Sequence, residues 1–215
     1  MLEDLSAEKI VSQILLKQIT VEEVVTHFLE RINKFNDSLK AIVSLKDEKI
    51  IREEAKNKKL QKLNEYQEKL LFGLPLAVKD LFDVKGLPTS YGLPEFKNNL
   101  ATKNSIIVER LINHGAIIIG KTNTPELGVG SHTTNKLFGV TANAYDTTKS
   151  AGGSSGGAAT AVAASLVPFA DGSDMMGSCR NPAAYANLYG FRPTPGLIPE
   201  NRNVKTDKKF PLLST

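Results

Sequence analysis

The sequence predicts an α/β fold in which a helical region precedes a sheet. All 16 glycines and 10 prolines of this 215-residue chain lie after residue 72. Because these residues interrupt regular structure, the region 1–72 is expected to be mainly helical and to pack on a core formed by the rest. Further along, a helical pattern at 105–114 lies between two apolar, strand-like segments. Strand, helix and strand in this order predict a right-handed crossover between parallel strands.

The helical region is expected to contain several helices and one short strand. Thr20 followed by Glu23 fits a capping box at the start of a helix over 21–33, whose apolar residues repeat at helical spacing. Residues 39–45 (LKAIVSL) fit a strand. The highly charged stretch 47–70 predicts a helix with a thin apolar face, which belongs in a solvated outer layer.

The region 73–215 changes to alternating strands and helices. The β-branched run at 116–121 is bounded by glycine, as is typical of a strand buried on both faces. An alanine-rich helix further on has small side chains that allow it to approach a sheet closely. In order, the region predicts a strand at 73–80, a helix at 105–114, a strand at 116–121, a helix at 158–166 and a strand at 167–174.

Composition excludes several classes of protein. Hydrophobic residues at 41% and charged residues at 23% exclude a disordered or fibrous chain. One cysteine and three scattered histidines provide neither a disulfide framework nor a metal-binding spacing, so no cofactor is expected. No apolar run approaches the ~20 residues of a membrane span, and the acidic start is unlike a signal peptide. Basic residues are mixed with acidic ones, which disfavours nucleic acid. We expect a cytoplasmic protein with no membrane or nucleic-acid partner.

Residues 115–122 (GAIIIGKT) match the phosphate-loop pattern G-x-x-x-x-G-K-[ST], but their composition argues against a nucleotide site. A phosphate loop forms a turn whose backbone N–H groups point at phosphate, whereas an isoleucine run is typical of a strand. Gly115 is better explained as the terminator of the preceding helix. Pro125 stands where the helix after the loop should run.

Residues 152–156 (GGSSG) match the G-x-S-x-G nucleophile elbow, but again the context is missing. An elbow needs a strand directly before the serine and a histidine after it. The preceding residues are polar, and the last histidine of the chain is His132. This motif therefore gives only weak support for a Ser–His–Asp hydrolase.

Three collinear segments carry a more specific pattern. They are a lysine at a strand end in GLPLAVKD (73–80), a Gly/Ser loop in SAGGSSGGAATAVAA (150–164), and a second serine in GSDMMGSCRNPAAYANLYGFRPTPG (172–196). Together with KTNTPELG (121–128) they resemble the amidase signature family. The resemblance implies a mixed central β-sheet flanked by helices. It also implies that 73–215 is the N-terminal half of an amidase domain, whose later half is absent and leaves the fold incomplete in this chain.

The same resemblance implies hydrolysis of carboxylic amides by a Ser–Ser–Lys triad. It assigns the nucleophile to Ser178, the proton relay to Ser154, whose peptide bond is cis in the family, and the general base to Lys79. It implies an oxyanion and substrate site at Met175, Met176, Gly177, Ser178 and Gly128. The chain departs from the family at Met176, where glycine is usual, and at Met175, where a small or branched residue is usual.

Lys79 can act as a base only when it is neutral. Burial with little neighbouring negative charge lowers a lysine pKa towards that state. Lys79 follows apolar residues at the end of a predicted strand, which suits burial, although a lysine at a strand end is ordinarily a surface residue. Its neighbour Asp80 is expected to point to the other face if the strand continues that far.

Residues close to Ser178 have their own expected roles. Asp174 and Arg180 are expected to fix the loop by charge-assisted hydrogen bonds, and Ser155 is expected to support the site by hydrogen bonding. An alternative nucleophile is Cys179 with His132 as its base, although a buried structural thiol is far more common.

Two other functions stay open. The chain fits a catalytically inactive amidase-like fragment or binding module, and it also fits the amidase-like subunit of a tRNA-dependent amidotransferase. The expected partner is a small-molecule amide, and a homodimer is left open. The sequence does not indicate which amide is cleaved.

Overall fold

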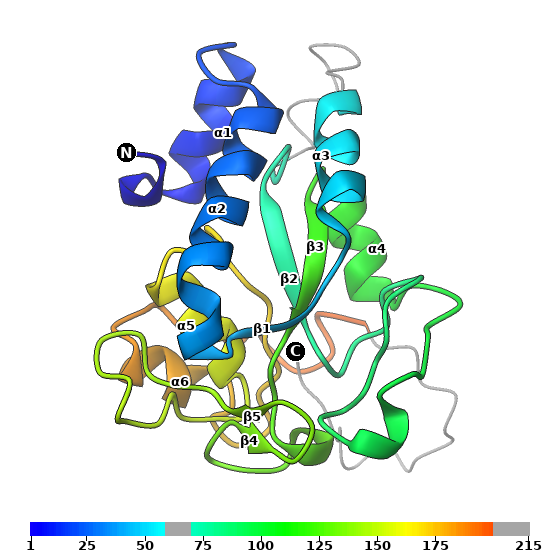
Figure 1. Ribbon diagram of the computed structural model, residues 1–215, viewed down its shortest axis with the longest axis vertical. Helices are drawn as coiled ribbons and strands as arrows, with labels where there is room; N and C mark the ends of the chain where they lie inside the picture. The colour runs from blue at the N-terminus through cyan, green and yellow to red at the C-terminus, as the bar shows by residue number, and fades with distance from the viewer. Residues whose placement is uncertain (59–69, 200–215) are drawn as a thin grey trace.

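The computed structural model describes residues 1–58 and 70–199 (Figure 1). None of the described helices is long and apolar enough to cross a membrane. The helices are α1 (Ala7–Leu15), α2 (Val21–Leu39), α3 (Glu48–Asn57), α4 (Ile106–Asn113), α5 (Gly156–Ala163) and α6 (Arg180–Tyr185), with short 3-10 turns η1 (Leu2–Asp4), η3 (Pro94–Phe96) and η4 (Glu126–Gly128). The strands are β1 (Ile42–Leu45), β2 (Pro75–Lys79), β3 (Ile117–Thr122), β4 (Thr134–Asn135) and β5 (Gly139–Val140).

The central sheet has the strand order β1–β3–β2. β2 runs parallel to β3, and β1 runs antiparallel to it. Because α4 lies between β2 and β3 in the chain, these three elements form the crossover that the sequence predicts. Every residue of β2 and β3 is buried. The predicted α/β class with a mixed, helix-flanked sheet is therefore confirmed.

Alternate residues of β2 and β3 enter two different apolar clusters, as expected of neighbouring positions on a strand. Ala77 and Ile117 belong to the larger cluster, which they form with residues of α1, α2, α3 and α5. Leu76 and Ile118 belong to a smaller cluster that includes Val108 of α4. The same alternation turns Lys79 towards the side of the sheet that α5 covers.

Several predicted boundaries differ from the observed ones. The helix predicted at 21–33 continues to the end of α2, because Phe35 and Leu39 keep its apolar stripe on the core. The strand predicted at 39–45 forms only over β1. α3 confirms the thin apolar face of the charged helix, since only Ile51 and Ala55 are buried, while residues 59–69 lie outside the described part of the chain.

The strand predicted at 167–174 is wrong, because this segment has no strand pairing. It meets β2 at Lys79, whose backbone N–H donates to Oδ1 of Asp171 (3.0 Å). A ladder between strands needs a backbone carbonyl as the acceptor. The Asp171 side chain takes that place, so the segment follows β2 without joining the sheet.

A buried ion pair joins β3 to the turn after β2. Lys121 Nζ lies 3.4 Å from Oδ1 of Asp80, and the two side chains are 0% and 1% exposed. Lys121 also donates to the carbonyl of Phe82 and to the hydroxyl of Thr89, while Asp80 accepts from the N–H and hydroxyl of Ser90. The lysine of the phosphate-loop pattern is thus used inside the fold, and Asp80 faces away from the partners of Lys79, as predicted.

We expect Lys121→Met to destabilise the fold by about 3–5 kcal/mol, because it leaves the Asp80 carboxylate buried without its cation. Urea unfolding followed by circular dichroism measures the change. Adding Asp80→Asn should restore a large part of the loss, since the amide is neutral and its oxygen still accepts from Ser90. An equal loss in the double variant would mean that the hydrogen bonds from Lys121 to Phe82 and Thr89, and not the charge pair, stabilise this region.

Candidate active site

The chain between Ser150 and α5 presents two adjacent serines to the end of β2. The peptide bond between Gly153 and Ser154 is cis, as the family resemblance implies. α5 follows directly and packs closely on the sheet, so that a Cβ at Gly157 would collide with the backbone of Asn123. Only glycine permits this approach, which holds Ser154 and Ser155 against the strand ends.

Lys79, at the end of β2, is the centre of a buried polar cluster. Its side chain is 0% exposed. Nζ lies 2.7 Å from Oγ of Ser154 and 2.8 Å from Oγ of both Ser155 and Ser173. An ammonium donates to all three hydroxyls, whereas a neutral amine has one lone pair with which it accepts a proton from one of them. The cluster is thus arranged for proton exchange between an amine and a serine.

Ser155 supports the cluster, as predicted. Ser173 is a further hydroxyl partner of Lys79 that the sequence did not indicate. Ser155 Oγ donates to the carbonyl of Ser173 (3.3 Å) and accepts from its N–H (3.2 Å). These contacts tie the loop before α5 to the segment 171–174. Ser173 lies two positions after Asp171, which also contacts Lys79, but no sequence signal marks either residue as a partner of that lysine.

The loop that carries Ser178 is held by Asp174. The carboxylate of Asp174 accepts from the N–H groups of Gly177 (2.7 Å), Cys179 (3.3 Å) and Arg180 (3.3 Å). The guanidinium of Arg180 adds two contacts of 2.8 and 3.1 Å. The predicted charge-assisted fixing of the loop is confirmed. Burial opposes ionisation of Asp174, but these donors outweigh it and hold the pKa of the carboxyl well below its usual range.

Ser178 lies beside the two serines through its backbone. Its carbonyl accepts from the N–H of Ser155 (2.9 Å), and its side chain is partly exposed. Among the hydrogen bonds of the described residues, none joins Oγ of Ser178 to Oγ of Ser154. The structure therefore brings Lys79 and Ser154 into direct contact and places Ser178 next to them without closing the last step between hydroxyls.

The methionine pair leaves the backbone of this loop accessible. The side chains of Met175 and Met176 are 46% and 81% exposed. Within the described residues, the N–H groups of Met175, Met176 and Ser178 have no acceptor in the chain, whereas that of Gly177 is taken by Asp174. Gly128 is the last residue of η4 and has a φ of +71°, which favours glycine.

Burial dominates the electrostatics around Lys79. It lowers the pKa of Lys79 to about 7, against the opposing charges of Asp171, Cys179 and Asp174. It likewise raises the pKa of Asp171 to about 6. The sequence predicts little negative charge near Lys79, and the Asp171 carboxyl corrects that expectation.

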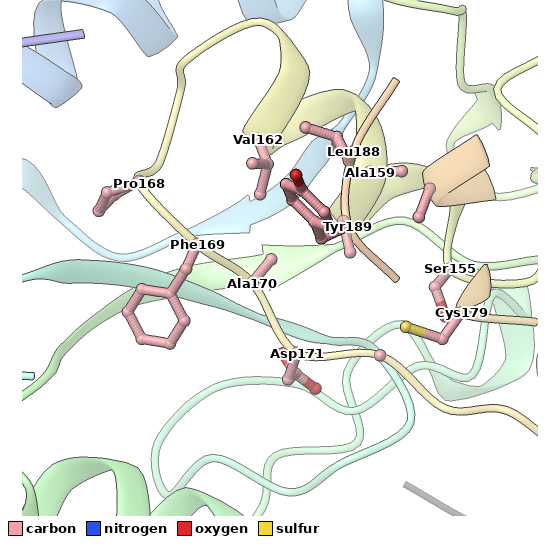
Figure 2. A pocket seen from close by; sticks show the side chains of 13 residues that line it. Ser155, Ala159, Val162, Pro168, Phe169, Ala170, Asp171, Cys179, Leu188 and Tyr189 are labelled. Atoms are coloured by element: carbon pink, nitrogen blue, oxygen red, sulfur yellow. The ribbon is translucent and has the colours of Figure 1, made fainter. Parts of the chain in front are cut away.

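A cavity of about 280 Å³ adjoins the cluster (Figure 2). Ser155, Asp171 and Cys179 lie at one end of it, and apolar side chains such as Val162 and Leu188 line the rest. Burial raises the pKa of the Cys179 thiol, which disfavours the reactive thiolate. His132 is engaged elsewhere, because its Nδ1 lies 2.7 Å from Oγ of Ser150. The geometry favours a structural Cys179.

Comparison with known proteins gives consistent matches. The family model Amidase matches residues 23–211. An acylamidase of Rhodococcus erythropolis is 41% identical over 198 residues, which are 91% of this chain and 41% of the relative. A glutamyl-tRNA(Gln) amidotransferase subunit from Trichodesmium erythraeum (strain IMS101) is 39% identical over 197 residues, 90% of this chain and 40% of the relative. A crystal structure of a bacterial aryl acylamidase of the amidase signature enzymes has a TM-score of 0.82 at 33% identity, covering 93% of this chain and 41% of that chain. The chain thus spans about two fifths of the length of these relatives.

We expect Asp174→Asn to loosen the loop around Ser178. The amide keeps one acceptor but loses the charge that binds Arg180, and hydrogen bonds to a charged group contribute about 2 kcal/mol. Hydrogen–deuterium exchange of residues 175–180 should become faster. Asp146→Asn is the matched control, because Asp146 holds its own exposed turn through Thr148 in the same manner. Unchanged exchange in Asp174→Asn would show that the carboxylate charge does not hold the loop.

Proposed function

Since the chain belongs to the amidase signature family, we propose that it hydrolyses the C–N bond of a carboxylic amide through an acyl-enzyme on Ser178. The observation that carries this proposal is the buried amine of Lys79 in direct contact with Ser154. A desolvated lysine with a pKa of about 7 is half neutral at that pH, so it can accept a proton without a histidine.

The proposed attack moves protons along the serines. Oγ of Ser178 forms a bond to the amide carbonyl carbon and releases its proton to Oγ of Ser154, which passes its own proton to Nζ of Lys79. The contact between Ser178 and Ser155 keeps the nucleophile within reach of this path. Contacts between catalytic groups are often open before substrate binds and tighten in the complex, which accounts for the open step between Ser178 and Ser154.

The developing oxyanion needs backbone donors that are not already used. The N–H groups of Met175, Met176 and Ser178 fit this role, because none of the described residues accepts from them. The side chain of Met176 is exposed and leaves these donors in place. Gly128 is assigned a backbone contact with substrate on the family pattern alone.

Collapse of the tetrahedral intermediate breaks the C–N bond. The nitrogen of the leaving amine takes the proton from Lys79 through Ser154, which returns Nζ to its neutral state. Water then attacks the ester carbon and gives its proton to Lys79 through Ser154. The C–O bond to Ser178 breaks, the carboxylic acid leaves, and the proton returns to Oγ of Ser178 by the same path. The first substrates to test are acylated anilides and short acyl amides, since an acylamidase and an aryl acylamidase are among the relatives.

A second candidate function is that of an amidase-like subunit in a tRNA-dependent amidotransferase. The 39% identity to a glutamyl-tRNA(Gln) amidotransferase subunit supports it. This function would use the same triad on glutamine, with the released ammonia consumed by a partner. Release of ammonia from glutamine, compared with release of aniline from an acylanilide, separates the two candidates.

We expect Ser178→Ala to abolish covalent labelling by a fluorophosphonate probe, because the acylated oxygen is removed while the fold is kept. Mass spectrometry of the labelled full chain locates the adduct. Cys179→Ala is the matched control at the next residue and should retain labelling. An adduct on Cys179 or Ser154 in the unaltered chain would contradict the assignment of the nucleophile.

We expect kcat/KM to be half-maximal at a pH of about 7 and to level off roughly one unit above it, because only the neutral form of Lys79 accepts a proton and that form accumulates above its pKa of about 7. Lys79→Arg should be inactive throughout, since a guanidinium stays protonated. Lys40→Arg, an exchange at a half-exposed lysine on the surface, should leave the profile unchanged. Near-normal turnover by Lys79→Arg would rule out the general-base role.

A further inference from the structure

The side chain of Asp171 contacts the backbone of Lys79, the proposed general base, and one of its two carboxylate oxygens makes no hydrogen bond. Oδ1 accepts from the N–H of Lys79 (3.0 Å). Among the described residues, Oδ2 is buried without a hydrogen-bond partner. The side chain lies at the end of the cavity that Ser155 and Cys179 also line (Figure 2).

A neutral side chain would serve the Lys79 N–H equally well. An amide or hydroxyl oxygen accepts one backbone N–H, and it avoids the cost of a buried carboxylate oxygen without a donor, about 1–3 kcal/mol or more. The carboxylate therefore has a use beyond that single hydrogen bond. Its charge acts in a region of little water, where electrostatic interactions are strong.

Among the described residues, few charged groups surround Lys79 and Asp171. Lys79 and Lys121 are the cations that act on Asp171. Asp171, Cys179 and Asp174 are the groups that act on Lys79. Cys179 has a raised pKa and is neutral near pH 7, and Asp174 is bound to Arg180. Lys121 is paired with Asp80. Asp171 is thus the carboxylate next to Lys79 that has no cation of its own.

Building on the proposed amide hydrolysis, we propose that Asp171 is a positioning residue that acts as the counter-charge for the ammonium formed on Lys79 during acyl transfer. The proton of Ser178 passes to Ser154, and that of Ser154 passes to Nζ, which changes from –NH₂ to –NH₃⁺. Asp171 remains a carboxylate throughout and receives no proton. When the leaving amine takes the proton back, Lys79 is neutral again. The pKa of the Asp171 carboxyl suits this role. Burial raises it only to about 6, so the group is ionised at the pH of about 7 at which Lys79 loses its proton.

The test is Asp171→Asn in the full chain, which keeps an oxygen for the Lys79 N–H and removes the charge. Without the counter-charge, Lys79 should lose its proton more easily, and the rising limb of kcat/KM should move to lower pH by about one unit. The ¹⁵Nζ resonance of Lys79, assigned by its absence in Lys79→Met, should titrate at correspondingly lower pH. Asp37→Asn removes a charge from an aspartate that is 97% exposed and should move neither quantity. If Asp171→Asn fails to fold, Asp171→Ser takes its place, since its hydroxyl also accepts.

The outcomes separate this proposal from the proposed function. In Asp171→Asn, the rising limb of kcat/KM and the titration of the Lys79 ¹⁵Nζ resonance could both stay at the pH found for the unaltered chain. That result would overturn the role of Asp171, even with Ser178 fully acylated. A shift of the same size in Asp37→Asn would overturn it as well. Failure to acylate Ser178 in the unaltered chain would instead refute the proposed function, while the NMR titration would still show whether Asp171 controls the protonation of Lys79.

Discussion

The removal of one amine from water is the constraint on which the rest of this structure depends. Lys79 stands at the end of a strand that is buried along its whole length, so its side chain has no route to solvent. Burying an ammonium alone is costly, and the fold meets that cost with three serine hydroxyls and a nearby carboxylate. These partners come from two other parts of the chain. The loop before α5 and the segment 171–174 are therefore both organised around Lys79.

The two buried lysines show how environment separates roles. Lys121 is as fully buried as Lys79, but it has a direct carboxylate partner, Asp80, and a backbone carbonyl. Burial lowers the pKa of Lys121 as well, but the contacts with Asp80 oppose that effect and make the residue part of the framework. Lys79 contacts hydroxyls, which interact with an amine in either protonation state. The same residue type is thus part of a structural ion pair near the end of β3 and the proposed general base at the end of β2.

The sequence predicted the architecture better than it predicted the surroundings of Lys79. Apolar runs and breaker residues located β2, β3 and α4, and the family pattern indicated the three candidate catalytic residues. The pattern of hydrophobic residues also suggested a strand at 167–174, where the Asp171 side chain takes the place of a carbonyl. Ser173 and Asp171 could not be predicted as partners of Lys79, because single side-chain contacts between distant segments leave no periodic trace in the sequence.

The contacts of Lys79 join residues that are 75 to 94 positions apart in the chain. Contacts of such high sequence separation form only after the intervening loops have closed. Before that point the lysine is hydrated, and a hydrated lysine has a pKa near 10.4, which leaves it protonated under neutral conditions. In the proposed mechanism, an incompletely folded chain therefore carries its serines without the neutral amine that would activate them. Under that proposal, chemical reactivity arises together with the native fold.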